Sequence, residues 1–157
     1  MDKQMVVYDL RKDERKHVLK LAGVPTAGTD DFYSCLNADF TLGKMAAGLS
    51  CGHVQLVDLE VAQPLQIFAS HRSLVRRAIA DWSSSQIATC SYDGCVHISD
   101  LRTSRVALKL GDQNGAPCDA MDVDFGQQVA LTASVGSPTT LWDLRKGQSC
   151  KEYECTG

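Results

Sequence analysis

The sequence has no long apolar segment and no excess of positive charge. None of its apolar runs approaches the roughly 18 residues of a membrane-spanning helix, so a membrane protein is not expected. Its 19 acidic residues outnumber its 16 lysines and arginines, which gives a formal net charge of −3. Proteins that mainly grip phosphate backbones carry basic surfaces. Nucleic-acid binding is therefore disfavoured, and the cluster Arg72, Arg76 and Arg77 is interpreted as a solvated edge.

The sequence also lacks the short motifs of common catalytic centres. It contains no phosphate-binding GxxxxGK[ST] loop, no Gly-x-Ser-x-Gly nucleophile turn and no His-Glu-x-x-His zinc motif. Asp122 and Asp124 share one face of an expected strand, but exposed carboxylates are ordinary on protein surfaces. His53 and His97 are expected at corresponding strand positions of two repeats. We therefore predict no catalytic residue, no cofactor and no enzymatic activity.

Disulfide chemistry is not expected either. The chain begins with the polar segment Met1–Gln4, which does not resemble a secretory signal. Its 7 cysteines are an odd number, which favours reduced thiols and a cytoplasmic or nuclear protein. The pairs Cys90/Cys95 and Cys150/Cys155 raise the question of zinc. In an alternating strand pattern these thiols fall on or beside strands, where a free cysteine behaves as a small apolar residue, so no metal site is predicted.

What the sequence does contain is a repeat. Four segments end in Asp-Leu followed by a charged residue, and their aspartates are Asp9, Asp58, Asp100 and Asp143. The separations between them are 49, 42 and 43 residues. A period of about 40 to 45 residues made of strands is the spacing of a β-propeller blade. No segment of useful length shows helical periodicity, so we predict an all-β fold.

Short apolar runs divide the repeats into strands. We predict a half blade over residues 1–21 and blades of four antiparallel strands over residues 32–69, 75–110 and 119–155. In the first full blade, the fourth strand is expected to follow Pro64. In the second, Asp93 and Gly94 supply a tight turn, because Asp and Gly tolerate the backbone angles that a hairpin needs.

These features resemble the WD-repeat β-propeller family. Trp142-Asp143 is the family's name-giving dipeptide, and three other endings are degenerate forms of it: Tyr8-Asp9, Val57-Asp58 and Ser99-Asp100. Ser91, Asp93 and Gly94 match the family's turn between the second and third strands, and His71 stands where the family carries Gly-His. The resemblance covers about residues 5–155.

The resemblance implies a hydrogen-bonded network in each blade, built in the family from His, Ser or Thr, Asp and Trp. In the middle blade it implies His71, Asp93 and either Thr89 or Ser91, with Ser99 in place of the Trp. In the last blade the Trp is present, and Asp112 stands near the expected position of the His. Such networks rigidify a structure when every member is satisfied, so the middle blade is expected to be less rigid than a consensus blade.

The repeats amount to about three and a half blades, whereas propellers close with four to eight. The prediction is therefore an open arc or a truncated propeller, with apolar faces exposed at its ends. Further propeller sequence or a protein partner could supply the missing blades. Self-association is a third option, although simple pairing of two copies would leave two half blades incomplete.

We predict a non-catalytic scaffold that assembles proteins, because propellers present loops and edges as rigid docking surfaces. An alternative comes from Arg11, Arg102 and Arg145, which each follow a repeat aspartate by two residues. This ending resembles the WDxR motif of substrate receptors that dock on the propeller adaptor of cullin-4 ubiquitin ligases. The planar guanidinium suits pairing at an interface, but an ordinary Asp–Arg pair within a blade is the competing interpretation.

Overall fold

Strands and their connecting turns make up the computed structural model, which describes residues 4–9, 14–20, 31–111 and 116–154. None of the described residues forms a helix long and apolar enough to cross a bilayer. The strands are β1 Gln4–Asp9, β2 Glu14–Lys20, β3 Tyr33–Asp39, β4 Lys44–Leu49, β5 His53–Asp58, β6 Gln63–Ala69, β7 Val75–Asp81, β8 Gln86–Ser91, β9 Val96–Asp100, β10 Arg105–Leu110, β11 Cys118–Asp124, β12 Val129–Ser134, β13 Thr139–Asp143 and β14 Gln148–Tyr153.

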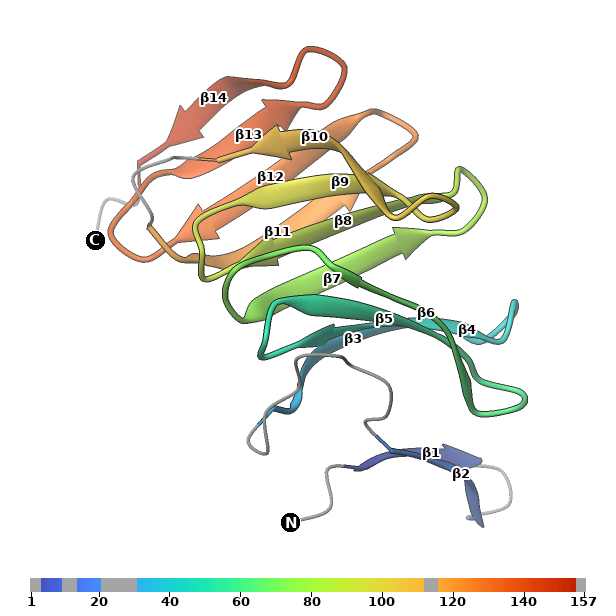
Figure 1. The fold of residues 1–157 in the computed structure, drawn as a ribbon. Helices are drawn as coiled ribbons and strands as arrows, with labels where there is room; N and C mark the ends of the chain where they lie inside the picture. The colour runs from blue at the N-terminus through green and yellow to red at the C-terminus, as the bar shows by residue number, and fades with distance from the viewer. Residues whose placement is uncertain (1–3, 10–13, 21–30, 112–115, 155–157) are drawn as a thin grey trace.

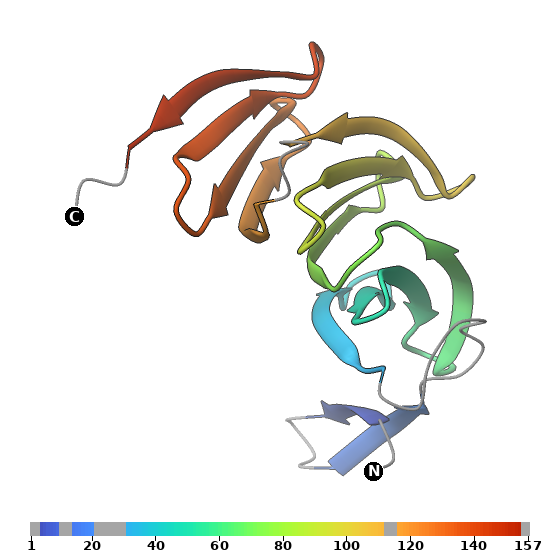
Figure 2. The ribbon, with the colours of Figure 1, turned by 60° about the vertical axis from the view of Figure 1, so that its left-hand side comes forward.

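Each sheet is a meander in which consecutive strands pair antiparallel. Strands β3–β6 form blade 1, β7–β10 form blade 2 and β11–β14 form blade 3, while β1 and β2 form a separate pair. The blades follow one another in chain order (Figure 1), and they lie along an open arc with β1 and β2 at one end and β14 at the other (Figure 2). The predicted fold class, all-β with four-stranded blades in an open arrangement, is confirmed.

The hydrophobic cores lie between the blades. In β8, Ala88 and Cys90 pack with Met121 of blade 3, whereas Ile87 packs with Phe68 of blade 1. Successive residues of a strand point to opposite faces of the sheet, so one strand supplies two cores. At the N-terminal end, the buried Met5 of β1 packs against blade 1 in the same way.

Strand β6 begins earlier than predicted. The fourth strand was expected to follow Pro64, whereas β6 starts at Gln63 and pairs Pro64 with Val57 next to a register shift. Strand β6 is the outer strand of its sheet. Proline is tolerated on such edge strands and at irregularities of the register.

Blade 3 has one face that no described residue covers. Leu131 on β12 is 40% exposed, although the residues at the same position of the other blades, Ala46 and Ala88, are 0% exposed. The third strand of blade 3 is only half-buried and its fourth strand is exposed throughout. The face that packs on the next blade elsewhere in the molecule is open here.

Candidate functional site

The repeated aspartates close hairpin turns. The Asp58 carboxylate accepts hydrogen bonds from the backbone N–H groups of the residues two and three positions later, at 2.8 and 3.2 Å. Asp100 does the same at 2.8 and 3.3 Å, and Asp143 at 2.9 and 3.1 Å. Asp9 ends β1, and its side chain lies outside the described atoms. An aspartate that bonds its own turn favours a tight turn over a continued strand, so these residues have a structural role.

Three further aspartates close hairpin turns in the same way, and this role was not predicted from the sequence. Asp39, Asp81 and Asp124 end the first strand of each blade, and each accepts hydrogen bonds from backbone N–H groups of the following turn. Their separations of 42 and 43 residues repeat the period of the other set. That spacing could have identified these residues as part of the repeat. The Asp-Leu dipeptide that marks the other set is missing here, because a residue other than leucine follows each of the three aspartates.

Blade 2 holds a network around His71. The Nδ1 atom of His71 lies 3.1 Å from both carboxylate oxygens of Asp93, and its Nε2 atom lies 2.9 Å from Thr89 Oγ1. The hydroxyl partner is therefore Thr89, while Ser91 hydrogen-bonds backbone atoms of the neighbouring turns. Gly94 completes the turn with a positive φ of 81°, a region that glycine occupies without strain.

The carboxylate of Asp93 is saturated with hydrogen bonds. Besides His71, it accepts the backbone N–H groups of Arg72 at 2.9 Å and Cys95 at 3.0 Å. Partial burial alone would raise the pKa of Asp93, but these bonds and the nearby His71 hold it below its usual value. Burial lowers the pKa of His71, and Asp93 only partly opposes that shift. At neutral pH the arrangement is a neutral imidazole donating to an ionised carboxylate.

A second imidazole lies on the first. The rings of His71 and His97 are stacked, with centroids 4.2 Å apart and planes inclined by 5°. His97 is 5% exposed, and neither of its ring nitrogens has a hydrogen-bond partner among the described atoms. Burial, reinforced by repulsion from His71, lowers the pKa of His97 to about 4. Buried polar groups are normally hydrogen-bonded, so His97 is an exception.

Blade 2 has a large side chain at His97 and a small one at Ser99, whereas blade 3 has the small residue first and the large one second. The register pairs Thr89 with His97 in blade 2 and Thr132 with Thr140 in blade 3. The aromatic ring of blade 3 stands two residues later, at Trp142, where blade 2 has Ser99. In blade 2 a ring at position 97 therefore accompanies a serine at the position of Trp142, and the buried Ser99 hydroxyl has no partner among the described atoms.

The predicted correspondence between His53 and His97 is wrong. Strand β4 pairs Ala47 with Gln55, at the position where β8 pairs Thr89 with His97. The counterpart of His97 is therefore Gln55. The error arose because His53 precedes the valine of its strand, whereas His97 follows it.

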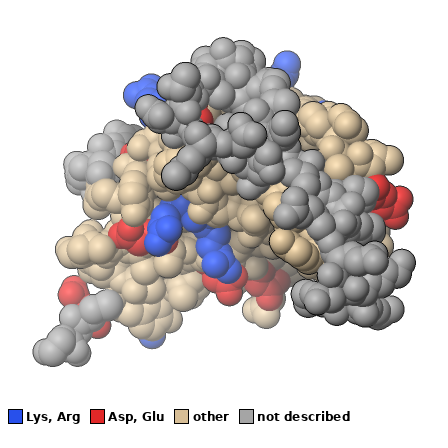
Figure 3. Space-filling view, turned by 90° about the horizontal axis from the view of Figure 1, so that it is seen from below, with Lys and Arg blue, Asp and Glu red and all other residues tan. Residues whose placement is uncertain are grey.

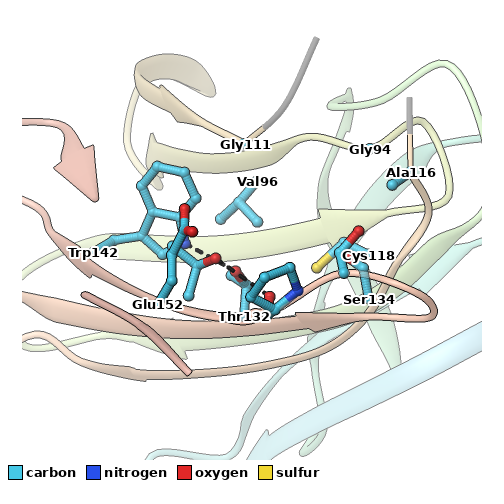
Figure 4. A pocket seen from close by; sticks show the side chains of 12 residues that line it. Gly94, Val96, Gly111, Ala116, Cys118, Thr132, Ser134, Trp142 and Glu152 are labelled. Carbon is cyan, nitrogen blue, oxygen red and sulfur yellow. Dashed lines mark hydrogen bonds between the residues drawn. The ribbon is translucent and has the colours of Figure 1, made fainter. Parts of the chain in front are cut away.

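Blade 3 keeps the Trp half of the network. Trp142 Nε1 donates to Thr132 Oγ1 at 2.8 Å. Beside this pair lies a cavity of about 290 Å³ between blades 2 and 3, and Glu152 of β14 lines it (Figure 4). Asp112, expected near the position of the His, lies outside the described residues. This cavity is the seam between blades 2 and 3.

The three candidate interface arginines differ in their surroundings. Arg102 Nη2 pairs with Asp100 Oδ2 at 2.7 Å, which is the ordinary pair within a turn. Arg145 donates only its backbone N–H to the Asp143 carboxylate, and Lys146 Nζ lies 3.9 Å from Asp143 Oδ2. The guanidinium of Arg145 therefore has no ion pair among the described residues. Arg11 lies outside the described residues.

Within the described part of the chain, no three His, Cys, Asp or Glu side chains gather as a metal site would require. Six cysteines there are free thiols. Cys51 Sγ lies 3.5 Å from His53 Nδ1 in the β4–β5 turn, a weak contact within one hairpin. Among the described residues in Figure 3, basic and acidic side chains lie next to each other. The described part of that face presents no continuous basic track.

No protein-family model matches the sequence, and no curated protein matches it. Among solved structures, the chain is similar to a chain of one described as "Crystal Structure of Mitotic Checkpoint Complex", with a TM-score of 0.80 and 14% sequence identity. The match covers 96% of this chain and 44% of that chain, so this chain spans less than half of its length. At this identity the likeness shows the fold alone, and that fold is a β-propeller.

Proposed function

We propose that the chain is a non-catalytic WD-repeat scaffold that holds proteins together in a larger assembly in the cytoplasm or nucleus. The uncovered face of blade 3 is the observation that carries this proposal. The similar solved chain comes from a structure named as a complex, which supports an interaction role. Free thiols at the described cysteines fit a reducing compartment.

The uncovered face has the character of a core surface. In blades 1 and 2, the residues equivalent to Leu131 are fully buried against the neighbouring blade. A leucine exposed at a position that is core in the other two blades fits an association surface. The occupant that fits it is a further propeller blade, contributed by a partner chain or by additional propeller sequence.

Substituting Leu131→Arg is expected to reduce association without unfolding the chain. Leu131 is already 40% exposed, so a charge there costs little in the free chain but opposes packing against an apolar blade. Light scattering should show wild-type species larger than the monomer and a shift of L131R towards the monomer. Thermal unfolding of L131R should match the wild type within a few degrees, as expected for about 0.5 kcal/mol or less.

Leu65→Arg is the matched control, because Leu65 is 53% exposed on the outer strand β6. It should leave association unchanged. A wild-type chain that stays a stable, well-folded monomer at all concentrations would contradict the role of the open face. A turnover activity lost on changing a single polar loop residue would contradict the non-catalytic part of the proposal.

The second candidate is a substrate receptor of a cullin-4 ubiquitin ligase, and the unpaired guanidinium of Arg145 beside Trp142-Asp143 favours it. Arg145→Ala should reduce copurification of the ligase adaptor by about tenfold or more, because the loss of a charged hydrogen-bonding partner at an interface costs at least that much. Arg102→Ala is the control, since Arg102 is already paired within its turn. Unchanged adaptor binding by R145A would rule out this candidate.

A further inference from the structure

A groove of about 550 Å³ lies in the seam between blades 1 and 2. Its lining includes Ala69 at the end of β6 and Lys109 on β10. The stacked rings of His71 and His97 both line it. The groove therefore opens between the outer strands of two adjacent blades, with imidazoles among its walls.

The groove carries a net positive charge. Arg72 and Lys109 line it, and neither has an ion-pair partner among the described residues. The carboxylate in the groove is Asp93, whose oxygens are already taken by His71 and by two backbone N–H groups. Burial and the Asp93 charge raise the pKa of Cys95, so its thiol stays neutral. Two cations are thus left without a carboxylate of their own.

The repeat does not account for this charge. The register pairs Lys109 with His97 in blade 2 and Glu152 with Thr140 in blade 3. Lys109 and Glu152 therefore occupy the same position of successive blades, and each lines the seam in front of its blade. Glu152 projects into the seam between blades 2 and 3 (Figure 4). One seam is basic and the next is acidic, so the fold itself requires neither charge.

The unpartnered ring of His97 is the second observation that points to a ligand. A buried imidazole that has no partner within the protein usually binds water, an ion or another polar group. Burial and repulsion from His71 keep the pKa of His97 low, and the compensation from Asp93 and the Ser70 backbone is too weak to offset them. A bound dianion would supply that compensation.

We propose that the groove binds a phosphorylated side chain of a partner protein, with the phosphate held between Arg72 and Lys109 above the stacked histidines. Arginine and lysine are the side chains that bind phosphate groups most strongly in proteins. The proposal rests on the scaffold function, since it assigns a class of partner to it.

The test is an NMR titration of the 157-residue chain with the peptide Gly-Gly-pSer-Gly-Gly, reading the ring C–H signals of His71 and His97. The unphosphorylated peptide, a Gly-Gly-Glu-Gly-Gly peptide and inorganic phosphate are the comparison ligands. The phosphopeptide should shift the signals of both rings saturably, and the unphosphorylated peptide should leave them unchanged. Lys109→Glu, which installs the residue of blade 3, should weaken binding about tenfold or more. Arg105→Ala on the same strand, outside the groove, should stay within about twofold.

Each other result overturns the proposal. Equal binding of the serine or glutamate peptide would remove the phosphate requirement. Inorganic phosphate binding as tightly as the peptide would make the site one for a free oxyanion, and equal losses in K109E and R105A would mean an adventitious ion only. Because the assay uses the purified chain and the L131R experiment probes a different blade, failure here is distinguishable from failure of the scaffold proposal.

Discussion

Replacing Gly52 with alanine is expected to lower the free energy of unfolding by about 3 to 5 kcal/mol. Gly52 lies in the β4–β5 turn with a φ of +86°, and a Cβ there would come within 2.3 Å of the carbonyl oxygen of His71. The Gly52 carbonyl accepts the N–H groups of Ser70 and His71 at 3.1 and 2.9 Å. The connection into blade 2 is therefore fixed against this glycine and cannot retreat without losing both bonds.

Gly136→Ala separates the clash from the backbone strain. Gly136 has a similar φ of +75°, but an added Cβ there would meet no atom within 4 Å. Its loss should be about 1 to 2 kcal/mol, the cost of the left-handed conformation alone. Urea unfolding followed by circular dichroism measures both variants. Similar losses at the two positions would mean that the contact between Gly52 and His71 does not hold blades 1 and 2 together.

Stability should fall as the pH drops from about 6.5 to about 4. The folded-state pKa values of His71 and His97 lie below the ordinary value of 6.5, so the unfolded chain binds more protons in this window. The contribution is complete above pH 6.5 and is lost on acidification. For His97, a pKa lowered to about 4 corresponds to about 3 kcal/mol. Asp93, with its lowered pKa, adds a loss only at still lower pH.

His97→Gln tests the source of this dependence, because glutamine is the residue at the equivalent position of blade 1. Urea unfolding at intervals between pH 4 and pH 7.5 should show a shallower slope for H97Q than for the wild type. His53→Gln removes an imidazole that is not stacked on another ring, and it serves as the control. If H97Q kept the full wild-type slope, the acid sensitivity would belong to other groups.

The fold was predictable because its determinants are local and repeated. A strand, a turn-closing aspartate and the next strand lie within about ten residues of each other, so Asp58, Asp100 and Asp143 could be found by spacing alone. The same locality explains why the turn at Asp93-Gly94 was recognised. The predicted open arc also followed from the sequence, since it depends only on the number of repeats.

The candidate site was only partly predictable from the sequence, because several of its residues differ from those at the equivalent positions of the other blades. The network partners His71 and Asp93 could be named from the family pattern, but the choice of Thr89 over Ser91 depended on register. The groove depends on Lys109, which has a residue of opposite charge at the equivalent position of the next blade. A comparison that looks for similar residues in successive repeats does not detect positions such as Lys109, where the repeats differ.

The aspartate turns have a consequence for how the molecule can change. Each carboxylate binds N–H groups of its own hairpin, so the strand register does not depend on the side chains at the tip. The tips of different blades carry very different residues, such as the exposed Phe40 and Leu42 in blade 1 and Arg145 in blade 3. Substitutions can therefore accumulate at one tip without disturbing the others, and the surface formed by these tips can acquire or exchange binding partners by a few residues at a time.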